Sequence, residues 1–182
     1  MIRRFWLSFL LLIGCSSPSS HVHRFPRFPP ELAGIFDHGV DLIENPSALQ
    51  GQWKSDWFHE LRTRVESADR IVLLSVHTIR TDTDPNRRTT YRIVATVLEE
   101  LYGTVGDDDV LLSVSNSDRG YAGVQLNQSR ILNQRFIVFI RRFTDRGILG
   151  QHWHLSLATT PVLDETLRVL RGRASSASVE SP

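Results

Sequence analysis

Two histidines separated by one residue are the clearest candidates for metal chemistry in this sequence. His152 and His154 lie in a strand-like segment, and alternate residues of a strand point to the same face. Imidazole nitrogens are common zinc ligands, and His77, in another strand-like segment, is the only reasonable third histidine. No His-Glu-x-x-His motif and no cysteine pair completes a ligand set. The pair is interpreted either as metal ligands or as surface or hydrogen-bonded histidines, with Trp153 and Leu155 facing the core.

A polar segment carries oxygen ligands at alternate positions. Asp82, Asp84 and Asn86 have the spacing that opens a calcium-binding loop, but arginine stands where that loop needs glycine, and isoleucine where it needs glutamate. The Asp-Pro-Asn sequence instead predicts a polar turn. With Arg87 and Arg88, Asp82 and Asp84 form a mixed-charge surface suited to a protein partner.

Other catalytic and cofactor motifs are missing from the sequence. It has no Gly-x-Ser-x-Gly, no phosphate-binding glycine loop and no dinucleotide fingerprint, so neither a cofactor nor enzymatic activity is predicted. Its 21 basic and 20 acidic side chains give a net charge of +1, which argues against a nucleic-acid-binding protein. A length of 182 residues is typical of one domain.

The N-terminal region has the order of features expected of a signal peptide. Arg3 and Arg4 precede an uncharged, mostly apolar run over residues 5–14, which ends at Cys15, the only cysteine. This run is about half of the ~20 residues that a helix needs to cross a bilayer. Residues 1–14 are therefore predicted to be a signal peptide.

The residues that close this run, Leu12-Ile13-Gly14-Cys15, resemble the lipobox of bacterial lipoproteins. The resemblance implies cleavage before Cys15, a diacylglycerol on its thiol and acylation of the new amino terminus. Ser16, where an aspartate favours inner-membrane retention, implies an outer-membrane location in a Gram-negative host. Two or more acyl chains hold a protein stably on a membrane. Residues 15–30, rich in serine and proline, are predicted to form an extended tether.

The tether is followed by a predicted amphipathic helix that begins at Asn45-Pro46 and covers about twenty residues. Five apolar residues recur at every fourth position along it: Leu49, Trp53, Trp57, Leu61 and Val65. This stripe packs against the core or, through Trp53 and Trp57, against a protein partner.

From Asp69 onward an apolar period of two predicts five strands, over residues 71–80, 90–100, 110–115, 136–142 and 152–157. A polar loop is expected at 81–89, and a last helix from Thr160-Pro161 to Gly172. The chain is thus predicted to be α+β, with one globular domain at 31–172 and a disordered tail at 173–182.

The strand order and apolar pattern of residues 68–171 resemble the netrin and tissue-inhibitor-of-metalloproteinase-like OB domains. The resemblance implies a small, partly open, five-stranded barrel flanked by an N-terminal amphipathic helix and a C-terminal helix. The chain lacks the disulfide cysteines of the secreted animal members, and a lipidated Cys15 could not act as their inhibitory amino terminus.

Together these resemblances imply a non-catalytic outer-membrane lipoprotein, with its domain in the periplasm or at the cell surface. Its expected partners are the membrane, through the lipid, and other envelope proteins in a complex related to motility or adhesion. The chain resembles accessory lipoproteins of deltaproteobacterial envelope machines, including gliding-motility complexes. The alternative is an envelope metal- or ligand-binding enzyme that uses His77, His152 and His154.

Overall fold

The structure, a computed structural model, describes residues 25–103 and 109–179. The predicted signal peptide, Cys15, most of the predicted tether and the end of the tail lie outside the described residues. None of the described helices is both long enough and apolar enough to cross a membrane.

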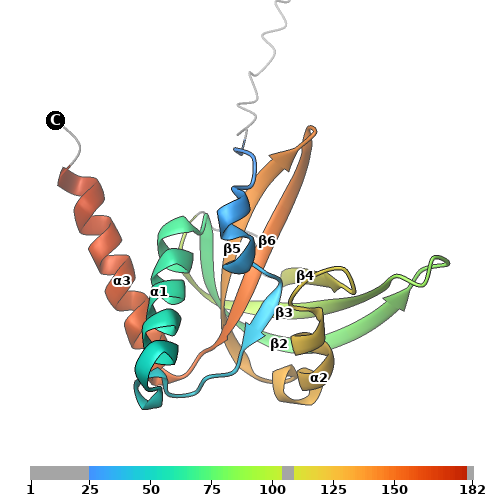
Figure 1. The fold of residues 1–182 in the computed structure, drawn as a ribbon, viewed down its shortest axis with the longest axis horizontal. Helices are drawn as coiled ribbons and strands as arrows, with labels where there is room; N and C mark the ends of the chain where they lie inside the picture. Colours follow the sequence, from blue (N-terminus) through green and yellow to red (C-terminus); the bar gives the residue numbers. More distant parts are fainter. Residues whose placement is uncertain (1–24, 104–108, 180–182) are drawn as a thin grey trace, which may run out of the picture.

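The described chain forms one six-stranded sheet with three α-helices (Figure 1). The strands are β1 (Gly39–Asp41), β2 (Arg70–Thr83), β3 (Thr89–Tyr102), β4 (Asp109–Ser115), β5 (Arg135–Asp145) and β6 (Ile148–Leu157). The helices are α1 (Gly51–Ser67), α2 (Tyr121–Ile131) and α3 (Thr160–Val179), with short 3₁₀ turns at Pro30–Gly34 and Pro46–Ala48. The sheet order is β1-β6-β5-β2-β3-β4, and only the β1–β6 pair is parallel.

The central strands β2 and β5 are buried on both faces. On one face Ile71, Ile137 and Phe139 pack in the apolar layer formed with α1 and α3. On the other face, side chains that include Val72 and Val138 point into the curl of the sheet, where α2 covers them. A strand that is covered on both faces needs apolar residues at every position, and residues 136–140 have this continuous apolar pattern.

The sheet curls into a half-barrel, and a tryptophan side chain reaches across its interior from β6 to β4. Trp153, on β6, is fully buried, and its Nε1–H donates a hydrogen bond to the backbone oxygen of Ser113 on β4 at 3.2 Å. β6 is the fourth strand along from β4 in the sheet order. The indole therefore bridges the interior and sets how far the sheet closes.

The predicted α+β class is confirmed, but the described sheet has six strands rather than five. The additional strand, β1, has three residues and pairs with β6 in parallel, too short a segment for an apolar period to indicate. Helix α2 was also not predicted, because only Val124 and Ile131 of it are buried. The predicted loop at 81–89 is shorter than expected, since β2 and β3 stay paired as far as Thr83 and Thr89.

Helix α1 begins later than predicted and buries less of the apolar stripe. Asn45 caps only the 3₁₀ turn, where its Oδ1 accepts a hydrogen bond from Ser47 N–H at 3.0 Å, and the α-helix starts at Gly51. Four residues turn a helix by roughly 400°, which is about 40° more than one full turn. Residues at every fourth position therefore move gradually around the helix and do not all face the core. Trp57 is buried, at 6% exposed, whereas Trp53 is 79% exposed.

Helix α3 continues past Gly172, where the sequence analysis expected it to end and a disordered tail to follow. Arg173 anchors this part of the helix, because its guanidinium donates hydrogen bonds to Val65 O at 2.7 Å and Ala68 O at 3.2 Å. It also lies over the Tyr102 ring, 4.0 Å from the centroid. These contacts offset the helix-weakening effect of glycine, about 1 kcal/mol.

Two glycines near α2 provide a matched test of how α2 packs on β1. A Cβ at Gly120 would lie 2.3 Å from backbone atoms of His38, whereas a Cβ at Gly123 would find Val40 at 3.9 Å. We expect Gly120→Ala to lower the free energy of unfolding by about 2 kcal/mol or more. Gly123→Ala should leave it unchanged or raise it by up to ~1 kcal/mol. Denaturant titrations of both variants check this, and equal effects at the two positions would contradict the packing.

Candidate functional site

Three polar side chains from distant parts of the chain form a hydrogen-bonded series, here called the histidine cluster: His152, His38 and Asp118. Nδ1 of His152 lies 2.8 Å from Nε2 of His38, and Nδ1 of His38 lies 3.2 Å from Oδ2 of Asp118. The Asp118 carboxylate also accepts hydrogen bonds from Ser115, at 2.7 Å from its backbone N–H and 3.1 Å from its hydroxyl. Asp118 is therefore held firmly against His38.

The backbone at His38 is in an unusual conformation that aims its ring into the cluster. Its φ is +60°, in the left-handed region that few non-glycine residues adopt. The N–H of His38 donates to Trp153 O at 2.9 Å, and its ring stacks on those of His152 and Trp153. Such conformations are held by surrounding contacts and are common at functional sites.

An open cleft of about 240 Å³ adjoins the cluster. Phe28, Phe36 and Arg119 contribute to its lining. The His152 ring contacts two aromatic rings, with its centroid 4.2 Å from that of Phe28 in the N-terminal segment and 4.7 Å from that of Phe143 on β5. Burial and the neighbouring His38 lower the pKa of His152, which favours its neutral form near pH 7.

The hydrogen bonds of the cluster connect the Asp118 carboxylate to the His152 ring through both nitrogens of His38. With His38 Nδ1–H donating to Asp118, His38 Nε2 is left to accept from the Nδ1–H of His152. Because these contacts use opposite nitrogens of one ring, a single metal ion could not bind through both. Among residues 25–103 and 109–179, no three His, Cys, Asp or Glu side chains are grouped so that they could hold a metal.

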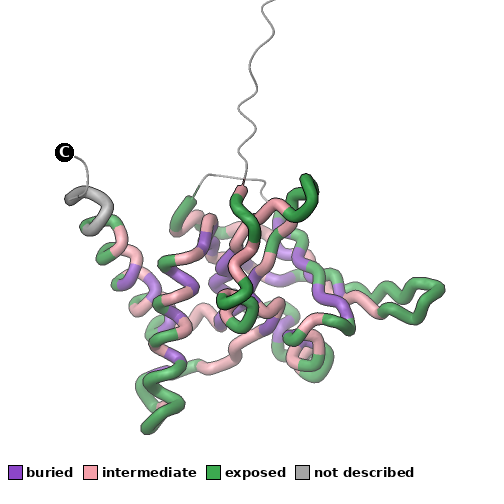
Figure 2. The backbone as a smooth tube through the Cα atoms, turned by 45° about the horizontal axis from the view of Figure 1, so that its top comes forward, coloured by how far each residue is buried: buried purple, intermediate pink, exposed green. Residues whose placement is uncertain are grey.

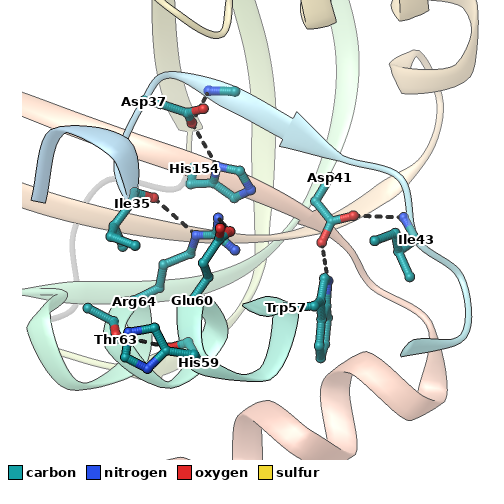
Figure 3. A network of polar contacts seen from close by, with 11 residues as sticks. Ile35, Asp37, Asp41, Ile43, Trp57, His59, Glu60, Thr63, Arg64 and His154 are labelled. Carbon is teal, nitrogen blue, oxygen red and sulfur yellow. Dashed lines mark hydrogen bonds and ion pairs between the residues drawn. The ribbon is translucent and has the colours of Figure 1, made fainter. Parts of the chain in front are cut away.

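A second polar network lies beneath α1 (Figure 3). His154 is buried, and its Nδ1 lies 2.9 Å from Oδ1 of Asp37. Arg64 is also buried, and it donates to the backbone oxygen of Ile35 at 3.0 Å and to the Glu60 carboxylate at 2.8 Å. Burial and the positive charge of Arg64 lower the pKa of His154. This shift favours the neutral form of His154, which lies between α1 and the sheet.

Beside this network Asp41, at the end of β1, binds the indole of Trp57 (Figure 3). The Trp57 Nε1–H donates to Oδ2 of Asp41 at 2.5 Å, and the other carboxylate oxygen accepts from Ile43 N–H at 2.8 Å. Trp57, predicted as a candidate for partner binding, thus packs inside the domain and connects α1 to β1. Of the two predicted tryptophans, Trp53 is the exposed one.

The three predicted histidines occupy different environments. His152 and His154 share one strand, but His152 contacts His38 whereas His154 contacts Asp37. His154 is buried beneath α1 and is not a surface residue. His77 is exposed on β2, which β5 separates from β6. His38 and Asp118 were not among the predicted site residues, because no local pattern connects residues that lie so far apart along the chain.

The predicted mixed-charge surface lies on the β2–β3 hairpin, which projects from the body of the domain (Figures 1 and 2). Residues 80–88 are all exposed. Asp84 builds the turn, since its Oδ1 accepts from the backbone N–H groups of Asn86 at 2.8 Å and Arg88 at 2.9 Å. The Arg88 guanidinium donates to the Ser115 hydroxyl at 3.1 Å. Asp84 and Arg88 therefore shape the hairpin.

Two other predicted residues of this hairpin are more available to a partner. Asp82 pairs with Arg92 at 2.5 Å, and both side chains are about half exposed. Arg87 has a φ of +61° at the turn, and in the described part of the chain its side chain has no partner. Arg87 is thus the accessible cation at the end of the projection.

Comparisons with known proteins assign no family. No family model matches the chain, and no curated protein matches it. Among solved structures, the OB4 domain of the yeast telomere protein Cdc13 is 17% identical, and the match covers 74% of this chain and 97% of that one. Its TM-score is 0.25, and at that level the similarity carries no argument about fold or function.

Because burial lowers the pKa of His152 and His154, stability should depend on pH. An unfolded histidine has a pKa of about 6.5, so below this pH the unfolded chain binds more protons than the folded one. The free energy of unfolding should therefore fall as the pH is lowered through about 6.5, by up to ~1.4 kcal/mol per unit for the fully buried His154 and by less for His152, whose charge is partly screened by solvent.

His154→Asn tests this dependence, because the amide can still donate to Asp37 but does not titrate. We expect a lower free energy of unfolding at neutral pH and a smaller loss on acidification than in the parent. His77→Asn, which replaces an exposed histidine outside both networks, should keep the parent's loss. Denaturant titrations over a pH series measure all three proteins, and an unchanged loss in His154→Asn would count against a buried neutral His154.

Proposed function

We propose that this chain is an outer-membrane lipoprotein whose domain is a non-catalytic interaction module of a cell-envelope protein complex. The observation that carries the proposal is the order of basic residues, short apolar run and the sequence Leu12-Ile13-Gly14-Cys15. Acylation at Cys15 would hold the domain on the membrane without a spanning helix.

The start of the described chain supports an anchor close to the domain. Residues 25–30, expected to be tether, include Pro26, whose backbone oxygen accepts from Thr144 N–H at 3.0 Å, and Phe28, whose ring lies 5.5 Å from that of Phe143. The last part of the predicted tether therefore packs on the domain. Ten residue steps from Cys15 to Phe25 span at most ~35 Å.

The projecting β2–β3 hairpin supports a role in protein binding. Its strands stay paired as far as Thr83 and Thr89, and Asp84 fixes the turn, so the shape exists before any partner arrives. A pre-ordered element loses less conformational entropy on binding. Asp82 and Arg87 at its end offer both charge signs to an envelope protein.

We also infer that the half-barrel is an OB-like barrel to which β1 has been added. The five longer strands follow the order β6-β5-β2-β3-β4. Trp153 bridges the two ends of this order through Ser113, and α2 packs against the interior. A partly open five-stranded barrel is the OB-type arrangement.

A second candidate function, ligand binding or catalysis in the envelope, is favoured by the cleft beside the histidine cluster. It would use His152 with His38 and Asp118 in place of His77 and His154. His152→Gln separates the two functions. If the cleft binds a ligand or catalyses a reaction, this variant should lose the protein's function in cells but keep membrane anchoring and partner binding. An interaction module without a ligand site should keep all three.

Cys15→Ser tests the anchor. We expect the parent chain in the outer-membrane fraction, with incorporation of labelled palmitate, and the variant absent from that fraction and unlabelled. Ser16→Asp is the matched control, since the lipobox resemblance implies that it stays acylated but moves to the inner membrane. A Cys15→Ser chain that still fractionated with the outer membrane would rule out the proposed anchor.

A photoreactive benzoylphenylalanine in place of Arg87 tests the interaction surface in living cells. We expect a discrete adduct with an envelope protein. The same substitution at Ser129, exposed on α2, should give none. Arg87→Glu should weaken co-purification of that protein, because it reverses the charge at the contact. Adducts of equal yield at both positions, or none at either, would argue against the hairpin as the partner surface.

A further inference from the structure

The turn between β5 and β6 exposes two large aliphatic side chains. Ile148 is 74% exposed and Leu149 is 62% exposed, next to each other in sequence. Arg146 and Gly147 form a two-residue turn, and both have positive φ values, 48° and 82°. Turns of this kind match the twist of paired strands and make a tight hairpin. The two aliphatic side chains are therefore presented at a defined point.

The N-terminal segment runs along this same hairpin. Pro26 is hydrogen-bonded to Thr144, and the Arg142 guanidinium lies 5.8 Å from the centroid of the Phe25 ring. Figure 1 shows that the described chain begins on the side of the domain from which the β5–β6 turn protrudes. An anchor that holds residue 15 at a membrane would draw this side of the domain towards it.

The charges around the turn suit an anionic surface. Arg27 and Arg146 are exposed, and the described residues contain no partner for either side chain. Asp145, the last residue of β5, carries a negative charge next to the turn, and Arg142 on β5 adds a further positive charge. Guanidinium groups bind phosphates well, and aliphatic side chains beside them can enter the boundary between headgroups and acyl chains.

We infer that Ile148 and Leu149 insert into the bilayer that anchors Cys15, with Arg27 and Arg146 on lipid phosphates. This inference rests on the proposed lipid anchor. A membrane is favoured over a protein as the occupant because the chain enters the domain beside this turn. The anchor keeps the turn at a high local concentration near the lipid, so weak insertion is enough.

Insertion of the turn would give the domain a second attachment point besides Cys15 and would thereby restrict its orientation. In Figure 1 the β2–β3 hairpin projects at a steep angle to the β5–β6 turn. With that turn at the lipid surface, the β2–β3 hairpin would extend along the membrane. Its end, with Arg87, would then be accessible to a neighbouring envelope protein.

The test places an environment-sensitive fluorophore on Ile148→Cys in the full acylated chain. The protein is reconstituted in vesicles of phosphatidylethanolamine and phosphatidylglycerol that contain spin-labelled lipid. The lipid thioether leaves Cys15 unreactive to the label. Leu126→Cys is the matched control, because Leu126 is 81% exposed on α2. We expect several-fold stronger quenching at 148 than at 126, and weaker quenching at 148 after Arg27→Glu and Arg146→Glu.

Equal, weak quenching at the two positions would overturn the inference. The inference would also be overturned if the fluorophore at 148 were quenched or shielded from water only when a protein partner was present. The turn would then be a binding site for that protein. Flotation of the unlabelled parent separates this failure from failure of the proposed function. If the parent floats with the vesicles, the proposed anchor stands and only the insertion of the turn is refuted. If the parent does not float, both are refuted.

Discussion

Burial of the two central strands on both faces is the constraint on which the rest of the structure depends. Residues 136–140 of β5 are all buried, and so are Ile71 and Val72 on the neighbouring strand β2. Each fully buried aliphatic or aromatic side chain contributes ~1.5–3 kcal/mol, so both faces must stay covered. Helices α1 and α3 cover one face, and the curl of the sheet with α2 covers the other. The half-barrel with two outer helices follows from this requirement.

The N-terminal segment depends on this arrangement and completes it. Asp37, His38 and Asp41 are close together in sequence, yet they contact β6, the loop before α2, and α1, respectively. Phe28 adds an aromatic contact to the β5–β6 hairpin. Residues from Phe25 onward are thus part of the domain, so the described chain enters the domain beside the β5–β6 hairpin, while the β2–β3 hairpin projects from its body.

The longer helices and strands could be predicted from the sequence because the apolar residues of each follow a recognisable pattern. The β-branched alternation of residues 90–100 indicated β3, and the apolar run at 136–140 indicated β5. Strand β1 could not be predicted, since Gly39 becomes a strand residue only by pairing with His154. Among the candidate site residues His152 was identifiable from its spacing, but its contact with His38 spans 114 positions and depends on the folded sheet. The sequence did not indicate which of Trp53 and Trp57 is buried, because this depends on how α1 packs on the domain.

We propose that this domain is held close to a membrane by its N-terminal anchor. The central claim is that Cys15 attaches it there. Mass spectrometry of the N-terminal tryptic peptide from the purified membrane protein tests this claim most directly. We expect a peptide that begins at Cys15, ends at Arg24 and carries diacylglycerol on the thiol. A peptide that continues upstream of Cys15, with the thiol unmodified, would contradict it.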